Sequence, residues 1–415
     1  MSYSVFDSYF KLTKDTESAR ITHRWACVSL IATLLGSNVH IQFGNTKVYP
    51  NLFILLVGSA GSRKSTAIKF AATQLRAAKY FNIAASSTSR EQFFEDFGAV
   101  LPVEILEQWK CGLLTDDELD KMVSEYAVIA DEFTDFAGVN NSGMYTSLGN
   151  LWDYRGVFEY RPKHGKKVAI INPVLNILGG TTADAFALAF PPATINQGLP
   201  SRLIIVNAMN RRRKIAWPII TPESEFMELK SRLLELKKLK GEMAVSDQAR
   251  AALRDIYEGW TPIPDARFAT YGNRRYVQLL KLCMIVAASQ HHMHIQRAHV
   301  VEANTILTFA ENHMPDALGE FGLNKSSVVS ARILNVVRYA PDGIISINDI
   351  YKAVAADVEN FDACRELLMN MVQAAKIQIT SAGVTPVVKD KKTSTNEMLH
   401  CKLHTLWENE KTDYT

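Results

Sequence analysis

A run of small and basic residues that follows an apolar segment is the feature with the clearest chemical meaning. Residues 52–57 are all apolar, and Gly58-Ser59-Ala60-Gly61-Ser62-Arg63-Lys64-Ser65 comes directly after them. A buried strand that ends in such a loop lets main-chain N–H groups surround a phosphate chain. Lys64 can then reach the β- and γ-phosphates, while the Ser65 hydroxyl binds Mg²⁺. We therefore expect a site for ATP and Mg²⁺.

One position departs from the usual motif. Arg63 stands where glycine normally precedes the lysine, although the spacing from Gly58 to Lys64 is kept. A plain glycine turn between a strand and a helix is the alternative, and the Lys64-Ser65 pair at this offset argues against it. The residues expected to contact the nucleotide from this loop are Gly58, Ser59, Ala60, Gly61, Ser62, Arg63, Lys64, Ser65 and Thr66.

A second apolar run ends in two carboxylates. Residues 126–130 read as a short buried strand, and Asp131-Glu132 follows at its tip. Asp131 is expected to bind the metal together with Ser65, and Glu132 is expected to activate the attacking water. The alternative is a solvated acidic turn. The segment between Lys64 and Asp131 is long enough for the helix and strand of an α/β nucleotide domain, which favours the catalytic interpretation.

Two later segments supply candidates for the same reaction. Arg202 precedes the apolar residues 203–206 and could neutralise charge at the γ-phosphate of a neighbouring subunit, as an arginine finger does. A surface arginine at the start of a strand is the alternative. Residues 176–182 read as another strand that ends in Thr181-Thr182, and either hydroxyl could orient the attacking water. The predicted catalytic residues are Lys64, Glu132, Thr182 and Arg202.

A basic turn lies between these elements. Residues 158–170 read as two β-like arms around a turn with four positive charges and a histidine. Such a tip suits the phosphate backbone of DNA. The alternative is a hairpin whose lysines only keep its edge soluble. The candidate nucleic-acid contacts are Arg161, Lys163, His164, Lys166 and Lys167.

Composition limits the class of protein. The chain has 415 residues, of which 47% are hydrophobic and 21% charged, so it can bury a full core in two or three domains. The net charge of +3 does not itself indicate a nucleic-acid partner. No segment is long and apolar enough to predict a membrane span. The chain has five scattered cysteines, which are Cys27, Cys111, Cys283, Cys364 and Cys401. They form no C-x-x-C pair, which indicates a reducing compartment and predicts a cytoplasmic protein.

The pattern of strands and helices predicts an α/β fold with additional helical parts. Residues 1–50 should form a helix over 15–35 and a hairpin over 39–49, and residues 51–217 an α/β core with a strand at 83–85. Residues 218–324 read as a helical lid with helices at 226–239, 247–259, 274–290 and 297–313. Residues 325–405 have the element order of a winged helix, which serves DNA or protein contact, and 406–415 form a polar tail.

The ordered set of motifs resembles a known family. Lys64-Ser65, Asp131-Glu132, a basic hairpin, Thr181-Thr182 and the segment that ends in Arg202 resemble the core of hairpin-inserted AAA+ ATPases, especially minichromosome-maintenance helicases. Residues 49–52 running into 61–65 also look like those of phage and prophage primase/helicase-like ATPases. The resemblance implies an AAA+ P-loop core with a helical lid and a C-terminal winged helix.

The same resemblance implies a function. It indicates a ring-forming, hexameric helicase that uses ATP and Mg²⁺ to move on single-stranded or forked DNA. Replication proteins are possible partners, and the expected location is the cytoplasm of the host cell. It also implies that Arg274, near the start of a lid helix, senses the nucleotide, with Arg275 as the alternative. No zinc-bearing collar or primase-like segment is present, so primase activity is not expected. An ATP-dependent replication initiator or loader and a nucleotide-dependent scaffold remain alternatives.

Two further groups carry weaker expectations. Four histidines, which we expect to form a solvated turn without a metal, gather between two helices: His291, His292, His294 and His299. The basic run at 211–214 is either a solvated linker or a second nucleic-acid or intersubunit contact.

Overall fold

The structure is a computed structural model of residues 1–415, and it forms two compact units. It describes residues 4–119, 121–139, 141–162, 167–190, 198–208, 214–319, 325–338, 340, 344–373, 376–380 and 383–386. The first unit extends to Gly319, and the second lies within Glu320–Ser394. Each unit is described by itself.

A parallel sheet forms the centre of the first unit. Its strands are β3 (Phe53–Val57), β4 (Glu125–Ala130), β7 (Val174–Thr181) and β8 (Leu203–Asn207), in the order β4-β7-β3-β8. Strands β3 and β7 are buried throughout, as expected of apolar runs in a parallel sheet that is covered on both faces. The predicted α/β fold with a parallel sheet is therefore confirmed.

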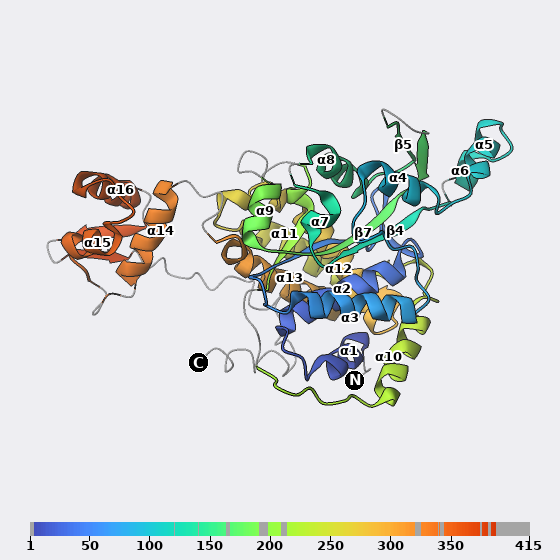
Figure 1. Ribbon diagram of the computed structural model, residues 1–415, viewed down its shortest axis with the longest axis horizontal. Coiled ribbons are helices and arrows are strands. Elements are labelled where there is room, and N and C mark those ends of the chain that lie inside the picture. Colours follow the sequence, from blue (N-terminus) through green and yellow to red (C-terminus); the bar gives the residue numbers. More distant parts are fainter. Residues whose placement is uncertain are drawn as a thin grey trace. The chain divides into compact units, whose positions relative to one another are not determined.

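Helices cover both faces of this sheet (Figure 1). Helices α2 (Arg20–Leu35) and α3 (Lys64–Ala77) lie on one face, and α7 (Phe133–Ala137) and α9 (Ala183–Ala189) lie on the other. Two adjacent glycines of β7 show this division, since a Cβ at Gly179 would meet Phe133 of α7, whereas one at Gly180 would meet Ile68 of α3. Helix α2 is buried along almost its whole length and is therefore a core helix.

The amino-terminal segment contains a helix that the sequence analysis did not predict. Helix α1 (Val5–Thr13) begins at a capping box formed by Ser4 and Asp7. The predicted helix over 15–35 begins only at Arg20, because residues 14–19 form the turn between α1 and α2. The hairpin expected next is confirmed as β1 (Val39–Phe43) and β2 (Thr46–Val48), and β9 (Gly241–Glu242) pairs with β1.

A group of shorter elements lies between α3 and β7. These are α4 (Arg90–Gly98), α5 (Val103–Lys110), α6 (Asp116–Leu119), α8 (Ser142–Leu151), β5 (Val157–Tyr160) and β6 (Val168–Ile171). The prediction of a strand at 83–85 was wrong, because within this described segment Ile83 forms an isolated bridge to Ala127 of β4 and no strand. The Ser89 hydroxyl caps α4 by accepting from the Gln92 N–H.

The helices predicted for the lid are present within a few residues of their expected bounds. They are α10 (Glu223–Leu236), α11 (Asp247–Gly259), α12 (Gly272–Ser289) and α13 (Arg297–Leu318), with the short strands β10 (Ala244–Val245) and β11 (His294–Ile295). Helix α13 packs on β8 and α12 packs on α2, so these helices share a compact unit with the sheet.

The second unit has its own apolar core. It contains α14 (Lys325–Arg338), α15 (Ile347–Val354), α16 (Phe361–Gln373), β12 (Ile377–Thr380) and β13 (Gly383–Pro386). Strands β12 and β13 form an antiparallel hairpin, and Ile345 bridges to Val384 of β13. Across both units, none of the helices described here has the length and apolar character needed to cross a membrane.

Candidate active site

The loop after β3 is held tightly between its neighbouring strands. The Gly58 N–H donates to the Thr181 carbonyl at 3.1 Å, and the Ala208 N–H donates to the Val57 carbonyl at 2.7 Å. A Cβ at Gly58 would lie 2.4 Å from the Ala208 carbonyl oxygen, a distance that no side chain tolerates. Glycine at position 58 is therefore required by the close approach of the chain that follows β8.

Two residues of the loop adopt left-handed backbone conformations. Gly61 has a φ of 80°, and Arg63 has a φ of 67°. The second value explains why the motif normally has glycine before the lysine, since this conformation costs a residue with a Cβ about 1 kcal/mol or more. Contacts from outside the loop offset that cost, because Arg63 is bound by Glu17 and Ser18.

Lys64 begins α3 and lies within the loop. Its side chain is buried, and Nζ donates to the carbonyl oxygens of Gly58 and Ser59 at 3.1 and 3.4 Å. Burial lowers the pKa of Lys64, and the negative charge of Glu132 opposes that shift. Negative charge from a bound ligand, added to that of Glu132, would therefore stabilise the ammonium group of Lys64.

The loop has the features needed to bind a triphosphate. The Ser62 hydroxyl is buried and makes no hydrogen bond within the described part of the chain. No acidic residue stands in the first turn of α3, so its N-terminal dipole faces the loop without a carboxylate of its own. These features fit ATP at this site.

The two carboxylates lie at the same edge of the sheet as Lys64. Asp131 follows β4, and its carbonyl oxygen approaches Gly180 so closely that a Cβ there would lie 2.5 Å away. Lys69, from the second turn of α3, forms an ion pair with the Asp131 carboxylate at 2.9 Å. The Ser65 and Asp131 oxygens are hard ligands of the kind that Mg²⁺ prefers.

Glu132 has a hydrogen-bond donor that the sequence analysis missed. The Thr134 hydroxyl donates to Glu132 Oε1 at 3.3 Å from the first turn of α7. Both residues are only partly buried, so this carboxylate can be reached by water. A threonine two positions after the acid was the only signal in the sequence.

The two threonines after β7 have different roles in the structure. Thr181 is buried, and its carbonyl accepts from the Gly58 N–H. The Thr182 hydroxyl accepts from the Ala185 N–H and caps α9. Both lie at the carboxyl edge of the sheet beside the loop, so the structure brings Thr182 to the predicted place while its hydroxyl serves as a helix cap.

Arg202 lies at the opposite edge of the sheet. Strands β3 and β8 are parallel, with Phe53 opposite Leu203, so Arg202 precedes β8 at the edge where β3 begins. Its Nη1 donates to the Gly198 carbonyl at 2.8 Å. Burial lowers the pKa of Arg202, the nearby Arg274 lowers it further, and Asp153 opposes the shift.

Arg274 lies beside Arg202 and away from Lys64 of the same chain. Its Nη1 is 3.6 Å from Asp153 Oδ2, and its guanidinium lies over the Trp152 ring at 5.7 Å from the centroid. Arg275 points elsewhere: it is buried and pairs with Glu311 at 2.8 Å. Of the two sensor candidates, Arg274 alone is partly exposed.

The residues before β3 stabilise this second edge. Asn51 is buried and donates to the carbonyls of Trp152 and Leu175. Lys281 is also buried, and its Nζ donates to Asn51 Oδ1 at 2.7 Å and lies over the Trp152 ring. Burial lowers the pKa of Lys281 well below its usual value, and the charge of Arg155 lowers it further.

The structure describes the two strands of the predicted basic hairpin. Strands β5 and β6 pair with Tyr160 opposite Val168, and Figure 1 shows this hairpin beside α4. The Tyr160 ring stacks on Phe94 of α4, with centroids 4.3 Å apart. Residues 163–166 lie outside the described part of the chain, so Lys163, His164 and Lys166 are not placed.

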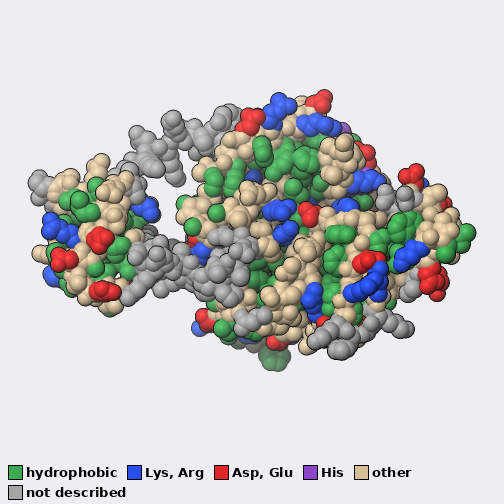
Figure 2. Space-filling model, turned by 90° about the horizontal axis from the view of Figure 1, so that it is seen from above, with side chains coloured by type: hydrophobic (Ala, Val, Ile, Leu, Met, Phe, Trp, Pro, Cys, Tyr) green, Lys and Arg blue, Asp and Glu red, His purple; other side chains and the backbone are tan. Residues whose placement is uncertain are grey.

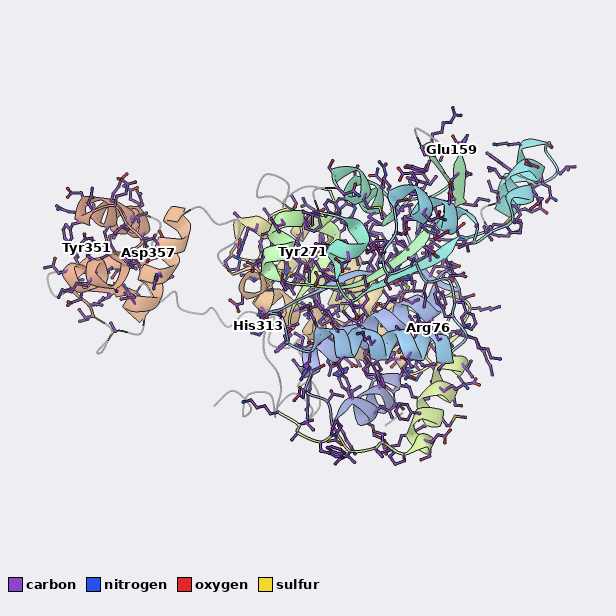
Figure 3. All side chains as sticks on the ribbon, in the orientation of Figure 1. Arg76, Glu159, Tyr271, His313, Tyr351 and Asp357 are labelled. Carbon is purple, nitrogen blue, oxygen red and sulfur yellow. The ribbon has the colours of Figure 1, made fainter. Side chains whose placement is uncertain are left out.

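The two described basic residues of the hairpin differ. Arg161 is exposed, whereas Lys167 forms an ion pair with Glu159. Figure 3 shows Glu159 on β5, toward the outer end of the first unit. On the face of that unit seen in Figure 2, Lys, Arg, Asp and Glu side chains are scattered among hydrophobic and other residues.

The remaining candidates do not assemble into a site. His292 and His299 contact each other at 3.3 Å between their ring nitrogens, and burial lowers the pKa of His299 to about 4. Among the described residues, no group of three or more His, Cys, Asp or Glu side chains could hold a metal ion. Residues 211–213 of the basic run lie outside the description.

Comparison with models of known protein families found no match, and comparison with curated proteins found no significant match. The geometry of the two sheet edges is therefore the basis for a functional assignment.

Proposed function

We propose that the chain is an AAA+ ATPase whose active site forms between two copies, and that it works as a ring-forming DNA helicase of a phage or mobile element. One observation carries this proposal. Lys64, Asp131 and Glu132 gather at the carboxyl edge of the sheet, whereas Arg202 and Arg274 gather at its amino edge. A closed ring of copies, such as a hexamer, would bring the two edges together.

Each residue then has a defined task. The Lys64 ammonium neutralises charge on the β- and γ-phosphates, and Glu132 accepts a proton from the attacking water. Ser65 and Asp131 would hold Mg²⁺, which supplies further neutralisation of phosphate charge. Arg202 of the adjacent copy stabilises the charge that develops as the γ-phosphoryl group leaves.

The role on DNA rests on two other features. The hairpin of β5 and β6 carries the basic turn predicted to contact the phosphate backbone, and Arg161, which directly follows β5 at the start of that turn, is exposed. The second unit has the order helix, bridge, two helices and hairpin, which is that of a winged helix. Both features support DNA as the partner.

A second candidate is an ATP-dependent replication initiator or loader that does not unwind DNA. It is favoured by the ion pair between Lys167 and Glu159, which reduces the charge that the hairpin offers to a phosphate backbone. Such a protein would use the winged helix as its main DNA contact.

Strand displacement of a forked DNA by the purified chain with ATP and Mg²⁺ tests the proposal. We expect unwinding, and a turnover of ATP that single-stranded DNA increases. ATP-dependent DNA binding without displacement would favour the initiator or loader. ATP turnover that DNA leaves unchanged, with no DNA binding, would indicate a nucleotide-dependent scaffold. Equal turnover by wild type and Lys64→Ala would overturn the ATPase assignment itself.

A further inference from the structure

Arg63 is bound by a distant segment through both its side chain and its main chain. Its Nε donates to Glu17 Oε2 at 2.6 Å, and the Ser18 hydroxyl donates to the Arg63 carbonyl oxygen at 2.6 Å. Both contacts come from the turn between α1 and α2. They act on the residue whose left-handed conformation sets the entry into α3.

This turn is itself anchored on several sides. The Thr16 hydroxyl donates to the Thr13 carbonyl at 2.9 Å and contacts His23 Nε2 at 2.8 Å. Glu17 uses its second oxygen to accept from the Ile215 N–H at 3.0 Å. Ser18 is almost fully buried. The carboxylate and the hydroxyl therefore approach Arg63 from a segment with little freedom to move.

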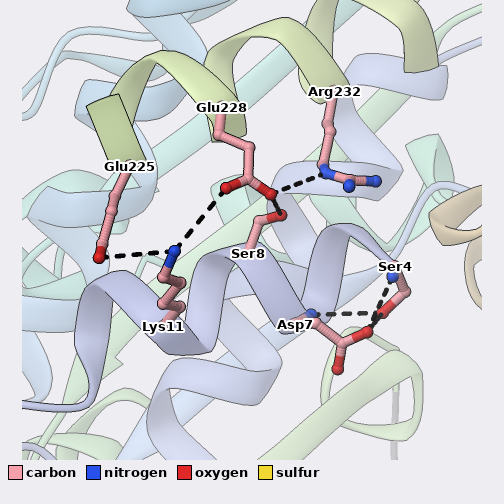
Figure 4. Close-up of polar contacts among 7 residues, drawn as sticks. All are labelled: Ser4, Asp7, Ser8, Lys11, Glu225, Glu228 and Arg232. Atoms are coloured by element: carbon pink, nitrogen blue, oxygen red, sulfur yellow. Dashed lines mark hydrogen bonds and ion pairs between the residues drawn. The ribbon is translucent and has the colours of Figure 1, made fainter. Parts of the chain in front are cut away.

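Helix α1 connects the turn to the lid. Lys11 lies 3.5 Å from Glu225 and 3.9 Å from Glu228, and the Ser8 hydroxyl contacts Glu228 at 3.4 Å (Figure 4). Arg232, one turn along α10, also pairs with Glu228. These contacts hold α1 on α10, and they involve neither Glu17 nor Ser18.

We propose that Glu17 and Ser18 are positioning residues of the phosphate-binding loop, an inference that rests on the proposed nucleotide site. Glycine at position 63 would reach the left-handed conformation without strain, but arginine needs external contacts to remain there. Lys64 follows directly, so the backbone of Arg63 determines where its ammonium group and the first N–H groups of α3 point. The amino-terminal segment thus takes the part that glycine plays in the usual motif.

A double-mutant cycle between Glu17→Ala and Arg63→Gly tests this role. The measurement is the Kd for MgADP by calorimetry, so that turnover does not enter. In the wild-type background we expect Glu17→Ala to raise the Kd about fivefold, which corresponds to about 1 kcal/mol. In the Arg63→Gly background the same change should raise it less than about twofold, because glycine no longer needs the contact.

The cycle removes effects that do not pass through Arg63. Loss of the Ile215 contact occurs in both backgrounds and cancels. Glu228→Ala is the matched control, since it removes an acid that contacts α1 but not Arg63, and its Kd should equal that of wild type. Melting temperatures without nucleotide check that each variant is folded.

The outcomes are distinct. An equal effect of Glu17→Ala in both backgrounds, no effect in either, or the same effect from Glu228→Ala would overturn the positioning role and leave the nucleotide site intact. If wild type fails to bind MgADP, or if Lys64→Ala binds it equally well, the proposed function fails and this inference fails with it.

Discussion

Arg202 offers the most direct test of an active site shared between copies. Arg202→Ala should nearly abolish ATP hydrolysis, because an arginine finger contributes about 10³–10⁵ in kcat. Strands β3 and β8 each contain five residues, so about 16 Å of sheet separates Arg202 from the loop of its own chain. An arginine side chain cannot span that distance, so under the proposed function Arg202 would act on the site of a neighbouring copy.

The magnitude follows from this division of the site. Each working interface needs Lys64 from one copy and Arg202 from the next. In an equimolar mixture of Lys64→Ala and Arg202→Ala that assembles at random, half of the copies keep Lys64 and half of their neighbours keep Arg202. About one quarter of the interfaces are then intact, so we expect up to about 25% of the wild-type rate, against about 0.1% for either variant alone.

The assay is steady-state ATP hydrolysis after subunit exchange, with exchange followed by fluorescence transfer between labelled copies. Lys64→Ala mixed with Glu132→Gln is the matched control. Both residues come from the same copy, so no interface in that mixture is intact and no activity should return. Normal hydrolysis by Arg202→Ala, or equal activity in the two mixtures, would refute the shared site.

Three further predictions concern catalysis, DNA contact and stability. Glu132→Gln should keep ATP binding but lower kcat by about 10²–10⁴, the contribution of a general base; unchanged turnover would contradict this. Replacement of the hairpin residues Lys163, Lys166 and Lys167 with alanine should weaken the binding of single-stranded DNA. The slope of log affinity against log salt concentration should become shallower by about one unit for each phosphate contact that is lost. A wild-type salt slope would instead favour the second unit or the basic run at 211–214 as the DNA contact. Glu311→Gln should destabilise the first unit by about 3 kcal/mol in urea unfolding, because the buried Arg275 loses its charge partner; a loss below about 1 kcal/mol would show that the pair contributes little.

Local sequence determined the elements that carry the chemistry. The apolar run before Gly58, the small residues of the loop and the apolar run before Asp131 predicted two buried strands with functional groups at their ends, and the structure has both strands. These features are readable because strand burial and loop geometry depend on neighbouring residues. Helix α1 was missed although Ser4 and Asp7 offer a local capping box, because this short helix is stabilised by packing on the distant helix α10.

Only the tertiary structure decided which of these groups meet. The strand order β4-β7-β3-β8 brings Asp131 to α3, and the parallel register of β3 and β8 places Arg202 at the far edge. Neither follows from spacing along the chain, since strand order and register depend on packing between distant segments. The same holds for Arg63: its sequence position shows a departure from the motif, and only the folded chain brings Glu17 and Ser18 to compensate for it.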